Sequence, residues 1–216
     1  MPLPLSDGFL ASARTVRDLI DRPEVADRWM AESACAGMTV GGLADHLATQ
    51  VGTTVRLLAA DPSDLVPIAL AEHYRRAAWV HSAPDEPANT EIRDSSNEQA
   101  KAGAAALRTH LAADLAALPD TLEAAAHRAP DAVMVPWQGW ALATADFLLI
   151  RMMEMVVHSD DLAASVDLPT PDFPDDVVAA VLGLLTMVAV ERHGQTALVR
   201  ALARPQRAPG DVSAFG

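Results

Sequence analysis

An apolar segment with one narrow polar stripe constrains the fold of this chain more than any other feature. Nearly every residue from 145 to 157 is apolar, but Arg151, Glu154, His158 and Asp161 recur at spacings of three and four. On an α-helix these four side chains share one face. A helix with so little polar surface is expected to be buried on nearly all sides. The segment therefore predicts a helical bundle whose polar stripe faces a thin strip of water or an internal site.

The remaining sequence carries the same helical signal. Half of the residues are apolar and only 4% are aromatic, a composition that favours helices over sheet. Apolar residues recur at helical spacing between Ser, Thr, Asp, Pro and Gly boundaries. We expect helices over residues 6–34, 40–60, 65–80, 95–118, 121–127, 144–166 and 175–193, and a short helix that reaches residue 204. Ser6 or Asp7, Thr39 and Thr144 are the expected N-caps of the helices that begin at 6, 40 and 144. The first helix is expected to break at Pro23, and Pro119 is expected to end the helix 95–118.

Two long connections, residues 61–95 and 119–143, separate the main helices. Within them, residues 82–96 are rich in polar and turn-forming residues and predict a surface loop. Residues 133–142 alternate in polarity and contain two tryptophans, which predicts a short hairpin or an extended lip. Long connections allow a bundle whose neighbouring helices are not consecutive in sequence. The fold class expected is therefore all-α.

Charge and cysteine content exclude several classes of function. The formal net charge is −13 and no basic block is present, which argues against nucleic acid and anionic membrane surfaces as partners. Cys35 is the only cysteine, so no intrachain disulfide is possible. The N-terminal residues lack the basic and apolar regions of a signal peptide. We expect a cytoplasmic protein, either a monomer or a homodimer.

The polar stripe has two interpretations. Arg151 and Glu154 can be ordinary charges on the solvent face of an amphipathic helix. Alternatively, Glu154 and His158 are buried, and a metal ion is one partner that satisfies both. A Glu and a His four residues apart can bind one cation, with further ligands from facing helices. Of the seven histidines, His46 is the best third candidate, because it lies on the edge of the core stripe of a capped helix among small residues.

Two segments resemble one known family. Gly37-Met38-Thr39-Val40-Gly-Gly-Leu43-Ala-Asp-His46-Leu47 resembles its "G-W-T/S-V-x-x-L-x-x-H-L" segment, and Arg151-x-x-Glu154-x-x-x-His158-x-x-Asp161-Leu162 is similar to its second signature. The family is that of the mycothiol-dependent maleylpyruvate isomerases, which belong to the DinB-like metal-binding bundles. The resemblance covers about residues 5–168. One departure is Met38, which stands where tryptophan is commoner.

The resemblance implies a fold and a metal site. The fold is a DinB-like four-helix bundle in the up-down-down-up arrangement over residues 1–168, with residues 169–216 as a C-terminal helical extension and tail packed on the same domain. The isomerase carries a further α/β domain that supplies a basic residue, whereas residues 172–216 predict two helices and a tail here. The implied metal ligands are His46, Glu154 and His158. Zn²⁺ is the usual metal, and Ni²⁺, Fe²⁺ or Mn²⁺ suit the same ligands.

The resemblance also implies a chemistry. The expected function is that of a divalent-metal-dependent transferase or isomerase that uses a low-molecular-weight thiol such as mycothiol as co-substrate against an electrophilic small molecule. Three protein ligands leave one coordination position open, as in catalytic zinc sites. Two alternatives remain: a non-catalytic metal- or ligand-binding bundle, and a metal hydrolase that needs no thiol.

Four further residues have two interpretations each, and a fifth, Cys35, has one. Asp161 is expected to orient His158 or to pair with Arg151. Arg151 is either that partner or a grip on an anionic substrate. Trp137 and Trp140 either line a pocket mouth or cover the end of the bundle. Cys35 has no base or cation beside it in the sequence and is expected to be a small buried residue.

Overall fold

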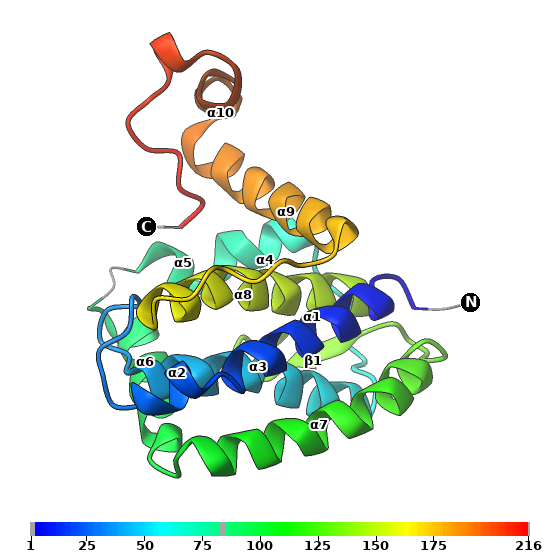
Figure 1. Ribbon diagram of the computed structural model, residues 1–216. Coiled ribbons are helices and arrows are strands. Elements are labelled where there is room, and N and C mark those ends of the chain that lie inside the picture. The colour runs from blue at the N-terminus through cyan, green and yellow to red at the C-terminus, as the bar shows by residue number, and fades with distance from the viewer. Residues whose placement is uncertain (1–2, 83–84, 216) are drawn as a thin grey trace.

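The computed structural model of the chain describes residues 3–82 and 85–215. Its centre is a four-helix bundle in which the first and fourth helices run in one direction and the second and third run in the other (Figure 1). Each of α1 and α3 packs against both α7 and α8. The up-down-down-up arrangement expected from the sequence is therefore confirmed. The four helices are α1 (Ser6–Ile20), α3 (Val40–Ala59), α7 (Ala104–Ala125) and α8 (Thr144–Ser165).

Helix α3 begins where the sequence predicted. The Thr39 hydroxyl accepts a hydrogen bond from the amide of Gly42, 2.9 Å away, and so satisfies one of the free N–H groups of the first turn. The face toward the core is mainly apolar, with Val40, Leu43 and Leu47 at 0% exposure. This burial fixes the rotation of α3 and turns the flank that carries His46 toward α8.

The region predicted as one helix over residues 6–34 is shorter and broken. Helix α1 ends at Ile20, and α2 (Pro23–Asp27) follows, with Pro23 at its first position, where a missing N–H costs nothing. The predicted break at Pro23 is confirmed, but residues 28–39 form turns, bends and an isolated β-bridge between Glu32 and Thr39, and not helix. Leu5 precedes α1 and no side chain caps it, so the predicted cap at Ser6 or Asp7 is wrong.

The prediction of one helix over residues 65–80 is also wrong. Residues 61–69 lack helical structure, because Pro67 has no N–H and restricts the residue before it. The amide of Ile68 instead donates to the carbonyl of Ala141, 3.0 Å away. Two short helices follow: α4 (Leu70–Arg76) and α5 (Ala78–His81).

Residues predicted as the loop 82–96 contain a helix, α6 (Pro87–Ala100); residues 83 and 84 lie outside the described residues. Helix α6 is polar but packs along α3, and the Asn97 side chain bonds the backbone of Thr39 and Gly37. These tertiary contacts stabilise a helix that its own sequence does not predict. Gly103 then breaks the predicted helix 95–118, because its φ of +86° suits glycine best.

Pro119 does not end the long helix, as the sequence suggested, but lies inside α7. An interior proline costs a helix roughly 3 kcal/mol. Leu118 and Leu122 on either side of it are almost fully buried, and their burial offsets that cost. Residues 121–125 of the predicted helix 121–127 are therefore the last part of α7, and residues 126 and 127 form a turn.

A small hairpin joins α7 to α8, as the alternation over residues 133–142 predicted. Strands β1 (Val133–Val135) and β2 (Trp140–Leu142) pair antiparallel, with Met134 opposite Ala141. The hairpin leads directly into α8. Thr144 is the first residue of α8 and does not cap it; its amide donates to Asp131.

The C-terminal part is helical, as predicted. Helix α9 (Asp175–His193) packs against α8, α1 and α4, and α10 (Gln195–Ala203) with a 3₁₀ turn (Pro205–Arg207) follows Gly194. The end of the chain returns toward α5 (Figure 1), where the Phe215 ring contacts Tyr74 and Trp79. Among the described residues, no helix combines the length and the apolar character needed to cross a bilayer.

Candidate metal centre

The structure brings His46 of α3 together with Glu154 and His158 of α8. One Glu154 oxygen, Oε2, lies 3.3 Å from Nε2 of His46 and 3.3 Å from Nε2 of His158. The two imidazole rings meet edge to face with their centroids 4.9 Å apart. The three side chains are 14–21% exposed, so the cluster is mostly buried but still open to solvent.

The geometry of this cluster fits a divalent metal ion. One ligand atom from each residue lies within 4.8 Å of the others. Ligands at about 2.0–2.2 Å from a tetrahedral ion are about 3.3–3.5 Å apart, and both nitrogen–oxygen distances in the cluster match that spacing. Two imidazoles and a carboxylate are also a donor set that zinc, iron and nickel accept.

Asp161 is placed to orient His158. Its Oδ2 lies 2.9 Å from Nδ1 of His158, one turn further along α8. Hydrogen bonding through Nδ1 leaves Nε2 directed at Glu154, and metal-binding histidines commonly have such a carboxylate partner. Of the two roles considered for Asp161, the structure shows the contact with His158. The alternative partner, Arg151, bonds elsewhere.

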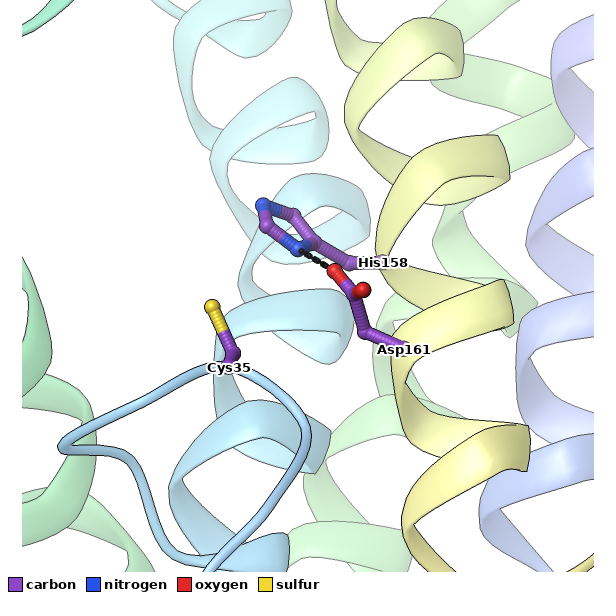
Figure 2. A group of neighbouring side chains, drawn as sticks. All are labelled: Cys35, His158 and Asp161. Carbon is purple, nitrogen blue, oxygen red and sulfur yellow. Dashed lines mark hydrogen bonds and ion pairs between the residues drawn. The ribbon is translucent and has the colours of Figure 1, made fainter. Parts of the chain in front are cut away.

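Cys35 lies beside His158, which the sequence did not reveal. Figure 2 shows its side chain rising from the connection between α2 and α3 toward His158 and Asp161. A sulfur, nitrogen and oxygen atom from these three residues lie within 4.8 Å of one another. The expectation that Cys35 is buried with no base beside it is wrong, because the thiol is half-buried and next to an imidazole. The contact joins two segments too distant in sequence for any local pattern to indicate.

The charges of the cluster depend on one another. Burial opposes ionisation of Glu154, but hydrogen bonds from His158 and His46 outweigh it and hold the pKa of Glu154 well below its usual value. Burial likewise opposes the charged form of His158, but Asp161, Cys35 and Glu154 together raise its pKa well above the usual value. Burial lowers the pKa of His46. The cluster thus holds an ionised carboxylate that favours a positive charge between the helices.

Arg151 connects the same two helices one turn away. Its Nη1 donates to Oε1 of Gln50, 2.9 Å away, and Nε2 of Gln50 donates to the carbonyl of His46, 2.8 Å away. The Arg151 guanidinium also lies over the Phe147 ring, 5.7 Å from its centroid. Gln50 was not predicted as a site residue, although its position four residues after His46 places both on one face.

Helix α4 contributes two buried residues next to this network. His73 is 3% exposed, and its Nδ1 accepts a hydrogen bond from Nε1 of Trp140, 3.1 Å away. Tyr74 is 4% exposed. Trp140 thus packs on the bundle, in line with the interpretation that it covers the bundle end. Trp137 is 53% exposed.

These features place the chain in a class and in a family. An all-α DinB-like bundle that gathers two imidazoles and a carboxylate between facing helices defines the class of metal-binding helical bundles. A sequence model of the mycothiol maleylpyruvate isomerase N-terminal domain matches residues 9–163, and the chain belongs to this metal-binding, mycothiol-related family. Comparisons with curated proteins and with solved structures found no match.

Proposed function

We propose that His46, Glu154 and His158 hold a divalent metal ion, preferably Zn²⁺, and that the protein is a transferase or isomerase acting with a low-molecular-weight thiol of the mycothiol type. The observation that carries the proposal is the convergence of three ligand atoms within 4.8 Å of one another, with both imidazole nitrogens 3.3 Å from the Glu154 oxygen. Ni²⁺, Fe²⁺ and Mn²⁺ accept the same ligands. When bound, the ion lowers the pKa of a coordinated thiol and keeps it as a thiolate.

The residues of the chain define what happens around that thiolate. Asp161 keeps Nε2 of His158 directed at the site by holding Nδ1. Glu154 is shared by both imidazoles and reduces the net charge of the centre. Since three protein ligands leave a position open, a small thiol can enter beside them.

Either reaction conserves atoms and charge. In a transfer, the thiol sulfur forms a bond to the electrophilic carbon, the leaving group departs with its electron pair, and the thiol proton goes to solvent. In an isomerisation, sulfur adds to one carbon of a C=C bond, the remaining single bond rotates, and sulfur leaves again. The thiol is consumed in the first case and recovered in the second.

The proposal is tested by an assay that measures the turnover of a thiol and an electrophile together. Zinc-loaded protein is assayed with mycothiol or a simpler thiol against activated aryl halides and cis-enedioic acids, in parallel with His46→Ala and with His127→Ala, a change at an exposed histidine. We expect turnover that needs both metal and thiol, that persists in His127→Ala and that falls at least about 100-fold in His46→Ala. Turnover in thiol-free buffer indicates a hydrolase instead, and no turnover despite bound metal indicates a binding module.

A further inference from the structure

Cys35, His158 and Asp161 form a second cluster of potential metal ligands beside the candidate metal centre. A sulfur, a nitrogen and an oxygen atom from these three residues all lie within 4.8 Å of one another. Figure 2 shows the Cys35 side chain pointing from its connection toward the two side chains of α8. The thiol is a potential ligand that the proposed function leaves unused.

The fold holds the thiol at this place through the residues on either side of it. The amide of Ala34 donates to Oγ of Ser165 at the end of α8, 2.8 Å away. The carbonyl of Ala36 accepts a hydrogen bond from Nη1 of Arg93 on α6, 2.9 Å away. Because both neighbours of Cys35 are anchored to helices, the three side chains are brought together before any ligand arrives.

The side chains of the cluster can be reached from solvent. Those of His158 and Asp161 are 21% and 31% exposed, and Cys35 is half-buried. An ion in solution can therefore approach all three residues without any opening of the bundle.

The spacing of the donor atoms suits a metal ion after a small adjustment. Oδ2 of Asp161 lies 2.9 Å from Nδ1 of His158. Ligand atoms that lie 2.0–2.3 Å from a tetrahedral ion are about 3.3–3.8 Å apart. Since the donor atoms lie within 4.8 Å of one another, none has to move by more than about 1.5 Å. Rotation of the Cys35 side chain about its Cα–Cβ bond provides a shift of this size.

The donor atoms differ in kind from those of the candidate metal centre. His46, Glu154 and His158 offer nitrogen and oxygen, whereas Cys35 offers sulfur, which favours soft ions. Zinc accepts either set of ligands, but Cd²⁺ and Cu⁺ bind sulfur in preference. Cys35 is the only cysteine of the chain, so the softness of the ion distinguishes the two clusters.

We propose that Cys35, His158 and Asp161 form a second metal site, which takes an ion softer than zinc, such as Cd²⁺ or Cu⁺. On binding, the sulfur forms a bond to the ion, and the protons displaced from the ligand atoms go to solvent. Because His158 belongs to both clusters, an ion at the second site competes for a ligand of the candidate metal centre. The second site does not depend on the proposed function and exists whether or not the first cluster binds zinc.

Titration of the metal-free protein with Cd²⁺ tests this site, because a cadmium–thiolate bond gives an ultraviolet charge-transfer absorption that nitrogen and oxygen ligands do not give. We expect the absorption to rise to saturation in wild type and to be missing in Cys35→Ser. Ca²⁺ has a similar size but selects oxygen ligands. It should therefore not displace Cd²⁺ at about 100-fold excess, and displacement would contradict a sulfur-containing site.

Variants separate this site from an isolated thiol and from the first cluster. Asp161→Asn should weaken Cd²⁺ binding about 10-fold or more, whereas Asp160→Asn, the same change at the preceding exposed residue, should keep the affinity within about threefold. His46→Ala should retain the absorption, because His46 is not part of the second site. Circular dichroism shows whether each variant is folded, and His158→Gln replaces Asp161→Asn if the latter unfolds.

Three results would overturn the second site. The first is the lack of a charge-transfer absorption in folded wild type at saturating Cd²⁺. The second is equal affinity in wild type and Asp161→Asn, which would mean that the thiol binds the ion alone. The third is loss of the absorption in His46→Ala, which would assign the sulfur to the first cluster. The proposed function is tested separately, by zinc binding and turnover.

Discussion

Asp161 holds His158 by the ring nitrogen that faces away from Glu154. Its Oδ2 lies 2.9 Å from Nδ1 of His158, whereas Nε2 of the same ring lies 3.3 Å from Glu154. A ring held in this way is oriented before any ligand arrives, which lowers the cost of metal binding.

This relationship predicts the effect of Asp161→Asn. The amide keeps the size of the side chain but loses the charge that strengthens the hydrogen bond to His158. We expect metal affinity to fall roughly 10- to 100-fold with little change in the far-ultraviolet circular dichroism spectrum. Competition with a chromogenic chelator measures the affinity. An unchanged affinity would mean that Asp161 contributes nothing to the centre.

Cys35 offers a second test, because two clusters share His158. One contains His46 and Glu154, and the other contains Cys35 and Asp161. If the first cluster holds the ion, Cys35→Ala keeps metal affinity within about threefold of wild type, since the thiol is not a ligand. A loss as large as that of His46→Ala in the same chelator competition would assign the ion to the cluster with Cys35.

His73 predicts a pH dependence of stability. Burial lowers its pKa to about 4, whereas an unfolded histidine titrates near about 6.5. Between these two pKa values the unfolded chain binds more protons than the folded chain does. The contribution of His73 to the free energy of unfolding is therefore complete above about pH 6.5 and is lost as the pH falls toward 4. The loss from this residue is at most about 3 kcal/mol. Urea unfolding at several pH values should show a shallower acid slope for His73→Asn, and identical slopes would contradict the prediction.

Replacing either of two glycines by alanine is expected to change the stability of the fold in opposite directions. A Cβ at Gly41 would lie 2.5 Å from the Trp29 ring, and Trp29 is itself nearly buried and bonded to the carbonyl of Ala100. Gly41→Ala should therefore destabilise the fold by about 1–3 kcal/mol. Gly183 in α9 has open space around it, so Gly183→Ala should be neutral or stabilise by up to about 1 kcal/mol. Thermal unfolding of both variants checks the difference, and equal shifts would contradict the packing at Trp29.

Helix caps and the spacing of apolar residues in the sequence correctly predicted those features of the fold that lie within a single helix. The Thr39 cap placed the start of α3, and the narrow stripe of α8 gave the relative positions of Glu154, His158 and Asp161. Caps and apolar spacing act within a few residues, so they are visible in the sequence. His46 could be chosen as their partner because its helix has a clear core face, which leaves it on the adjoining flank.

Contacts between distant segments account for what the sequence did not predict. Helix α6 is polar and forms through its packing on α3, and α7 continues through Pro119 because leucines on both sides are buried. The thiol of Cys35 reaches His158 only after the turns between α2 and α3 fold against α8. Tertiary packing outweighs local propensity in each case.

The metal content of the purified protein tests the central claim most directly. Wild type, His46→Ala and His127→Ala are purified without added metal, loaded with zinc and dialysed. Their zinc content is then measured by inductively coupled plasma mass spectrometry. With His46, Glu154 and His158 as ligands, wild type and His127→Ala should retain about one zinc ion per chain and His46→Ala very little. Equal and negligible zinc in all three proteins, or equal retention by wild type and His46→Ala, would contradict the metal centre.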